Sequence, residues 1–179
     1  MDYTPAPSAC QLLFCKISIV ILFTMLYNRF IREGYRMLIS TKGRYALRVM
    51  IDLAEHQGEG LIPLKVIAQR QEISEKYLES IIKLLVKSRL LSGVRGKGGG
   101  YQLTKTPDQY TVGSILRLTE DSLAPVACLE RDADTCPRSS ACRTLPLWQG
   151  LNRVINEYLD GVTVADLTRR GDAGDDYVI

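Results

Sequence analysis

Three cysteines lie close together in the second half of this 179-residue chain. Seven residues separate Cys128 from Cys136, and five residues separate Cys136 from Cys142. Three thiolates in one short segment are a donor set for a soft metal ion or an iron–sulfur cluster. The paired Cys-x-x-Cys knuckles typical of a zinc ribbon do not occur here. The spacing therefore favours a cluster, with thiol-based redox sensing and cysteines without a sensing role as the alternatives.

The segment that carries these cysteines, residues 128–145, is predicted to be a loop between helices. A short helix capped by Thr111 precedes it, within a helix-and-linker region over residues 111–127. A long helix is predicted over residues 146–167, because apolar residues recur there at helical spacing. One side of this helix holds Leu147, Trp148, Leu151, Val154, Ile155, Tyr158 and Leu159, and the other side holds Arg153, Asn156, Glu157 and Asp160.

This last helix needs a partner for its apolar side, because a lone amphipathic helix is marginal in water. We expect it to be a dimerisation helix that packs on a second copy, with Trp148 and Tyr158 in the dimer core. The alternative is a helix that folds back on its own domain. Residues 168–179 are polar and are expected to be a disordered tail.

The charge of the chain is unevenly distributed. Residues 37–110 hold 12 Lys and Arg against 7 Asp and Glu, a net charge of +5. Residues 111–179 hold 7 against 11, a net charge of −4. A basic half followed by an acidic half suggests a polyanionic partner for the first half, although two solvated faces fit the charges equally well.

The basic half contains a helix-turn-helix pattern. A first helix, capped by Ser40 or Thr41, places Tyr45, Ala46, Val49, Met50, Leu53 and Ala54 on one face. A short second helix starts at Pro63, and a third starts behind the N-cap Ser74. The third helix is predicted to bury Leu78, Ile81, Ile82 and Leu85, and to turn Lys76, Tyr77, Glu79, Ser80 and Lys83 outward. Two short helices joined by a tight turn describe a helix-turn-helix.

A glycine-rich hairpin is predicted to follow. Its flanks hold the strand-like residues Leu91, Val94, Tyr101 and Leu103. Its tip carries glycines with Arg95 and Lys97, so it can approach another backbone closely. A phosphate loop is rejected, because the run lies between strands and lacks a Gly-Lys-Ser/Thr ending. The pattern predicts a winged-helix DNA-binding domain over 37–110, with its third helix in the major groove and the wing arginine in the minor groove.

Three motifs closely resemble those of the Rrf-type winged-helix regulators. They are Ser-Thr-Lys-Gly-Arg-Tyr-Ala at 40–46, Ser74-x-x-Tyr-Leu-Glu79, and Val94-Arg-Gly-x-Gly-Gly-Gly-Tyr101. This family includes the iron–sulfur regulator IscR, the nitric-oxide sensor NsrR and the cysteine-metabolism repressor CymR, and the resemblance covers residues 37–167. It implies a mainly α fold with a small β-hairpin wing and a long C-terminal dimerisation helix.

The resemblance also implies a cytoplasmic homodimer in which each subunit reads half of a palindromic operator in double-stranded DNA, most simply as a repressor. The expected DNA contacts are Lys42, Arg44, Tyr45, Ser74, Lys76, Tyr77, Glu79, Ser80, Arg95 and Lys97. A structural disulfide is not expected in a reducing compartment. In IscR-like members three cysteines of this loop ligate a cluster, which implies an iron–sulfur cluster, with 2Fe–2S as the favoured type, at Cys128, Cys136 and Cys142.

The fourth cluster ligand is an open question. In the enterobacterial type a histidine follows the third cysteine by three residues, but that position is Leu145 here, and the only histidine, His56, is interpreted as a helix-end residue. In NsrR-like proteins an aspartate near the start of the partner subunit is the fourth ligand, but the matching position in this chain is Arg44. The candidates are a loop carboxylate (Glu130, Asp132 or Asp134), a residue of the partner's DNA-binding domain, or a small thiol.

Two other functions are weighed against this interpretation. A CymR-like regulator would respond through a partner enzyme, cysteine synthase, and would need no cluster; CymR itself lacks the cysteine triad. An enzyme is not supported, because no nucleophile–base set, phosphate loop or paired acids are present, and no small-molecule substrate is expected.

Residues 1–36 do not match the rest of the chain. The run from Leu12 to Tyr27 is almost wholly apolar, broken by Lys16 and followed by three arginines, which is a membrane-segment candidate of marginal length. We favour Met37 as the true start and residues 1–36 as a translated leader sequence, since family members begin at the matching methionine. A membrane-anchored regulator is the alternative. Cys10 and Cys15 fall in this segment and carry no weight.

Overall fold

The computed structural model describes residues 39–96, 98–134 and 136–172. The chain divides into two units at the junction of Arg36 and Met37, and all described residues belong to the second unit. The predicted leader at 1–36, with its candidate membrane segment, lies outside the described ranges, as do Lys97 and residues 173–179. Within those ranges, no helix is long and apolar enough to cross a membrane.

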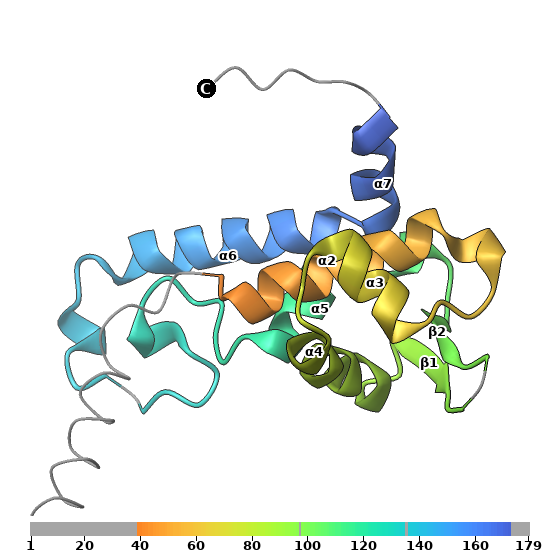
Figure 1. Cartoon of the computed structure of the whole chain (residues 1–179). Coiled ribbons are helices and arrows are strands. Elements are labelled where there is room, and N and C mark those ends of the chain that lie inside the picture. The colour runs from red at the N-terminus through yellow and green to blue at the C-terminus, as the bar shows by residue number, and fades with distance from the viewer. Residues whose placement is uncertain (1–38, 97, 135, 173–179) are drawn as a thin grey trace, which may run out of the picture. The chain divides into compact units, whose positions relative to one another are not determined.

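Three helices build the core of the first half (Figure 1). They are α2 (Thr41–Glu55), α3 (Leu64–Gln71) and α4 (Glu75–Lys87), and α2 contacts both of the others. The apolar stripe predicted for α4 is confirmed, because Leu78, Ile81, Ile82 and Leu85 are each at most 1% exposed. They belong to one core cluster with Ala46, Val49, Met50 and Leu53 of α2. Each fully buried aliphatic side chain of this kind stabilises the fold by roughly 1.5–3 kcal/mol.

Side-chain caps start α2 and α4 at the predicted serines. Ser40 accepts a hydrogen bond from the Gly43 N–H at 3.1 Å, and Ser74 accepts one from the Tyr77 N–H at 3.4 Å. Between α3 and α4 the chain reverses through Glu72, whose φ of 55° lies in the left-handed region. The tight turn followed by a capped helix confirms the predicted helix-turn-helix.

The predicted hairpin is also present. Strands β1 (Leu91–Val94) and β2 (Gly100–Leu103) pair antiparallel, with Leu91 opposite Leu103. Gly96 and Gly98 at the tip have φ values of 101° and 78°, a conformation that favours glycine. Gly100 lies so close to the backbone of Ile62 that a Cβ there would collide with it. That close approach allows Ile62 and Tyr101 to exchange backbone hydrogen bonds of 3.0 and 2.8 Å, which fix the base of the wing.

Three further helices form the second half, with short 3-10 turns between the main elements. The helices are α5 (Val112–Thr119), α6 (Leu145–Gly161) and α7 (Val164–Asp172), and the turns are η1 (Gln57–Glu59), η2 (Pro107–Gln109), η3 (Ala127–Leu129) and η4 (Ser139–Ala141). Helix α5 contacts both α2 and α6. The cysteine loop, with η3 and η4, connects α5 to α6 (Figure 1).

The C-terminal part of the chain differs from the prediction of one helix over 146–167 and a disordered tail from 168. Helix α6 ends at Gly161, and a separate helix, α7, extends to Asp172 and packs on α2. The break has a local cause: Val162 and Thr163 run extended in a short bridge to Thr111. Thr163 then starts α7 by exchanging hydrogen bonds of 2.7–3.1 Å with Asp166, as in a capping box.

Candidate functional site

Five of the ten residues predicted to meet DNA lie at the N-cap and on the outer face of α4. Ser74, Lys76, Tyr77, Glu79 and Ser80 are all exposed. Glu79 is paired with Lys83 at 2.8 Å, and the hydrogen bond from Lys83 lowers the pKa of the Glu79 carboxyl. The Ser80 hydroxyl donates to the Tyr77 carbonyl at 2.7 Å. These two local interactions limit how freely Glu79 and Ser80 can meet a new partner.

Two tyrosines connect α2 to α4. The rings of Tyr45 and Tyr77 meet edge to face, with centroids 5.9 Å apart. Arg48 lies over the Tyr45 ring at 5.2 Å, and its Nε donates to the Gln71 side chain at 3.0 Å while its Nη2 donates to the Gln71 carbonyl. Arg48 was not among the predicted site residues. It braces the turn before α4, so it contributes to the position of the predicted recognition surface.

A buried carboxylate, also missed from sequence, supports the same turn. Asp52 is 1% exposed, although it lies on a helix whose pattern predicted only apolar residues inward. It accepts hydrogen bonds from Arg70 at 2.9 Å and from Gln71 at 3.0 Å, both near the end of α3. Its carbonyl is 2.7 Å from His56 Nδ1 at the end of α2, consistent with a structural role for that histidine. An acid spaced among core positions is a sequence signal for such a network, but its partners are visible only in the fold.

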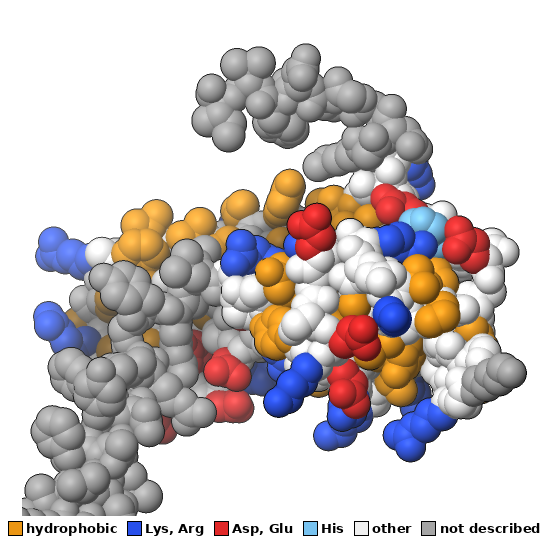
Figure 2. Space-filling model, in the orientation of Figure 1, with side chains coloured by type: hydrophobic (Ala, Val, Ile, Leu, Met, Phe, Trp, Pro, Cys, Tyr) orange, Lys and Arg blue, Asp and Glu red, His pale blue; other side chains and the backbone are white. Residues whose placement is uncertain are grey.

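The remaining predicted DNA contacts lie at the start of α2 and on the wing. Arg44 is exposed and its guanidinium donates to Thr41 at 3.2 Å, whereas Lys42 and Tyr45 are half-buried. Arg95 is exposed on the wing, and Lys97 lies outside the described residues. Figure 2 shows Lys and Arg side chains, interspersed with acidic ones, along the lower edge of the view, over α4 and the hairpin. The outer residues of α4 and Arg95 are thus all accessible to a partner.

The three loop cysteines line one cavity of about 260 Å³. Its other lining residues are Leu129, Ala133, Asp134, Ser139, Leu145 and Gln149. All three thiols are free, with Cys128 exposed and the other two half-buried. Among the described residues, no three or more His, Cys, Asp or Glu side chains are close enough together to hold a metal ion. The three thiols thus line one cavity, but in this structure they are too far apart to hold a metal ion together.

Cys142 lies just before α6, in surroundings that favour its thiolate. The Thr144 hydroxyl, 3.4 Å from its sulfur, is the main cause that lowers the pKa of the Cys142 thiol. The backbone N–H groups of Thr144 and Leu145 and the charge of Arg138 also lower this pKa, while burial opposes them. Three thiols facing one cavity, one of them with a stabilised thiolate, are suitable ligands for an iron–sulfur cluster.

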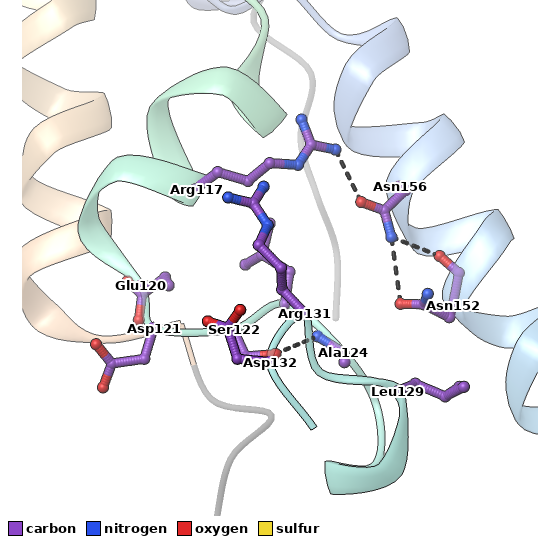
Figure 3. A pocket seen from close by; sticks show the side chains of 11 residues that line it. Arg117, Glu120, Asp121, Ser122, Ala124, Leu129, Arg131, Asp132, Asn152 and Asn156 are labelled. Atoms are coloured by element: carbon purple, nitrogen blue, oxygen red, sulfur yellow. Dashed lines mark hydrogen bonds between the residues drawn. The ribbon is translucent and has the colours of Figure 1, made fainter. Parts of the chain in front are cut away.

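A second, polar pocket of about 270 Å³ is also lined in part by this loop (Figure 3). Arg131 and Asp132 of the loop line it together with Arg117 and Glu120 of the α5 end and Asn152 of α6, among others. Leu129 lines both this pocket and the thiol cavity. The thiols thus line one of the two pockets, and Arg131 and Asp132 line the other.

Helix α6 meets the rest of the protein through its polar side. Arg117 of α5 donates to both carboxylate oxygens of Asp160 at 2.7 Å and to Asn156 at 2.8 Å. The apolar stripe remains open, with Leu147 62%, Leu151 38%, Val154 58% and Tyr158 64% exposed. Trp148, Ile155 and Leu159 are half-buried instead, so they stand apart from the exposed stripe. The sequence also allowed a helix whose whole apolar side packs on its own domain. The four exposed residues do not pack in this way.

Known proteins with similar sequences are transcriptional regulators. Residues 39–170 match the Rrf2 family, described as iron-dependent transcriptional regulators. The HTH-type transcriptional regulator IscR of Sodalis glossinidius is 39% identical over 131 residues, which are 73% of this chain and 78% of that protein. The IscR of Aliivibrio salmonicida is 38% identical over 131 residues, with 73% and 77% covered.

Two solved structures share the fold. CymR, the global cysteine regulator of B. subtilis, superposes with a TM-score of 0.61 at 39% identity, covering 74% of this chain and 97% of CymR. IscR of T. potens superposes with a TM-score of 0.59 at 37% identity, covering 79% of this chain and 92% of that IscR. These similarities confirm the family that the sequence motifs indicated.

Proposed function

Because this chain belongs to the Rrf2 family of transcriptional regulators, we propose that it binds a palindromic operator as a homodimer under the control of an iron–sulfur cluster. The observation that carries the proposal is the cavity lined by Cys128, Cys136 and Cys142, directly before helix α6. The protein would act in the cytoplasm, where its DNA lies.

The DNA-binding part of the proposal rests on α4 and the wing. Lys76, Tyr77 and Ser80 project from a helix whose opposite face is held by the core, so α4 can enter a major groove as a rigid unit. Arg95 extends beside it on a hairpin whose glycines allow close approach to the sugar–phosphate backbone. Lys42, Arg44 and Lys97 are proposed phosphate contacts.

The homodimer part rests on the exposed stripe of α6. Leu147, Leu151, Val154 and Tyr158 recur at intervals of three and four, the pattern of a helix that packs against another helix. A second copy of the same helix presents the same stripe, so a two-fold axis across α6 buries both. This arrangement would place two recognition helices on one operator, as its two half-sites require.

The cluster would be held by the three thiolates, and when bound it would supply a redox-sensitive group that can be oxidised or lost. To hold the cluster the three thiols would have to approach a common centre, and this would tighten the loop. The loop joins α5, which contacts α2, to α6, which carries the proposed dimer stripe. A tighter loop would therefore change how the two winged domains are spaced, and with it the affinity for one operator geometry.

The test begins with the chain purified without oxygen, with its visible spectrum and its iron and acid-labile sulfide measured. The wild type should contain iron and sulfide, and Cys136→Ala should be colourless. Operator fragments are then selected from genomic DNA, and their affinities are measured for cluster-bound and cluster-free protein. The proposal predicts at least one operator with a clear difference. A protein without iron, or one that binds all operators equally in both forms, would refute cluster control.

The similarity to CymR supports one alternative, a cysteine-responsive regulator controlled by a partner enzyme. In that case the Cys136→Ala variant would regulate normally, and cysteine synthase would change its operator affinity. The same binding assay, repeated with added cysteine synthase, separates the two functions.

A further inference from the structure

We infer that Asp134 is the fourth protein ligand of the cluster. This inference rests on the proposed cluster at the three cysteines. It replaces the histidine found in other regulators of this type by a carboxylate that is supplied from within the same loop of the same subunit.

Asp134 is the ionisable oxygen donor that faces the thiols. Apart from the cysteines, the cavity is lined by the apolar residues Leu129, Ala133 and Leu145, by the hydroxyl of Ser139, by the amide of Gln149 and by Asp134. A carboxylate is a good ligand for ferric iron, whereas a neutral hydroxyl or amide is a weak one. Within the described structure Asp134 makes no hydrogen bond or ion pair, and it is exposed. Its carboxylate can therefore bind iron without first breaking another interaction.

The other two loop carboxylates are placed elsewhere. Asp132 lines the polar pocket instead, together with Ser122 and Asn152 (Figure 3). Glu130 is half-buried and is not part of the thiol cavity's lining. Neither of these two carboxylates lines the cavity of the three cysteines, whereas Asp134 does.

The charge of the loop fits an anionic fourth ligand. Residues 128–145 contain three acids (Glu130, Asp132, Asp134) and three arginines (Arg131, Arg138, Arg143), so their formal charges cancel. Ligation adds the charges of three thiolates but no further charge at Asp134, whose carboxylate is already counted in this balance. An exposed oxygen ligand also makes one iron easier to release than a fourth thiolate would, which suits a sensor.

The test uses the full chain, loaded anaerobically with iron and sulfide. Wild type, Asp134→Asn and Asp134→Cys are compared by visible circular dichroism, by the electron paramagnetic resonance spectrum of the reduced cluster, and by the half-time of iron loss to a chelator. Asp134→Asn should change both spectra and shorten the half-time at least about tenfold, as losses at ligand-supporting positions do. Asp134→Cys should show the spectra of four-thiolate ligation and a longer half-time than the wild type.

Asp132→Asn is the matched control, because it removes the same charge from the same loop. It should leave the spectra and the half-time unchanged. Far-ultraviolet circular dichroism of the cluster-free proteins checks that each variant folds. The exposed Asp134 is not part of the core, so all of them should match the wild type.

The outcomes separate this inference from the proposed function. If the wild type binds iron and sulfide but Asp134→Asn has wild-type spectra and iron loss, Asp134 is not a ligand, and cluster control still stands. If Asp132→Asn or Glu130→Gln reproduces the expected changes instead, the assignment is wrong. If the wild type itself takes up no iron and sulfide, both the ligand and the cluster function are refuted.

Discussion

Ser40, the N-cap of helix α2, is held by Glu120, eighty residues further along the chain. One carboxylate oxygen of Glu120 accepts hydrogen bonds from the Ser40 N–H at 3.2 Å and from its hydroxyl at 2.8 Å. The same hydroxyl oxygen accepts the capping hydrogen bond from Gly43. Glu120 stands at the end of α5, where the linker to the cysteine loop begins. The start of the DNA-binding domain is thus tied directly to the segment that leads to the proposed sensor.

This connection predicts coupled effects on stability. Ser40→Ala and Glu120→Ala should each lower the free energy of unfolding by about 1 kcal/mol, as expected for a lost helix cap or charge-assisted hydrogen bond. The double variant should lose less than the sum of the two, by roughly 0.5 kcal/mol or more, because both changes remove the same contact. Denaturant unfolding of all four proteins measures this coupling, and strictly additive losses would show that the contact contributes nothing.

The buried Asp52 should be essential for the helix-turn-helix. Asp52→Ala removes the acceptor for Arg70 and Gln71 and leaves the partly buried guanidinium with the more distant Glu59, at 4.0 Å. The expected loss is about 3 kcal/mol of unfolding free energy. Asp108→Ala, at an exposed acid of the η2 turn, is the control and should change stability by less than about 0.5 kcal/mol. Chemical denaturation measures the unfolding free energy of both variants, and an equal loss in Asp52→Ala and Asp108→Ala would contradict the role assigned to Asp52.

Local patterns predicted the elements of the first half, because each signal acts within a few residues. Ser74 caps the helix that follows it, and Leu78, Ile81, Ile82 and Leu85 are buried as their spacing requires. Asp52 and Glu120 were missed because their partners lie 18 and 80 residues away, and no short-range pattern reports such contacts. From sequence alone, a charged residue in a helix is assigned to the solvent side, because its buried partner is visible only in the folded structure.

The end of the chain shows the same limit. Periodicity predicted one helix through Leu167, but the bridge of Thr163 to Thr111 divides it, and that pairing depends on the tertiary fold. Asn156 and Asp160 were assigned correctly to the side opposite the apolar stripe. Their contact with Arg117, rather than with solvent, could not be inferred from periodicity. In the cysteine loop, spacing identified the thiols, but only the fold distinguishes Asp134 from Asp132.

The proposed wing contact predicts a change in the salt dependence of operator binding. Arg95→Ala should weaken binding to all operator sequences and reduce the slope of log affinity against log salt by about 1. The reason is that the variant lacks one cationic side chain that contacts the phosphates or the groove. Arg169→Ala on α7 removes the same charge from a helix that contacts α2 and lies on the opposite side of it from α4 in Figure 1. It should leave the slope unchanged. Fluorescence anisotropy across a salt series measures both, and equal slopes for wild type and Arg95→Ala would remove Arg95 from the interface.

The exposed stripe of α6 predicts that one charge can break the dimer. Val154 is 58% exposed at the centre of the stripe, so Val154→Glu would bury an unpaired carboxylate in the proposed interface. The variant should sediment as a monomer at micromolar concentration, with an operator affinity at least about tenfold weaker, since a single half-site remains per protein. Arg153→Gln changes the net charge by the same amount on the flank of the helix and should remain dimeric. A dimeric Val154→Glu protein would place the interface elsewhere.

The Arg117–Asp160 pair predicts a pH-dependent connection between α5 and α6. The hydrogen bond from Arg117 is the main cause that lowers the pKa of the Asp160 carboxyl, and the charge of Arg117 adds to it. A folded pKa below the usual 3.8 means that the pair stabilises the fold above that pH and loses this effect as the pH falls through the lower folded value. Asp160→Asn should therefore cost about 0.5–1 kcal/mol at neutral pH, a small value because both side chains are partly exposed. Denaturant unfolding at several pH values should show the difference from wild type fading below pH 3.8. Asp108→Asn is the control, and its unfolding free energy should show no such pH-dependent difference from wild type. If Asp160→Asn is less stable than wild type by the same amount down to the lowest pH, the cause is packing and not ionisation.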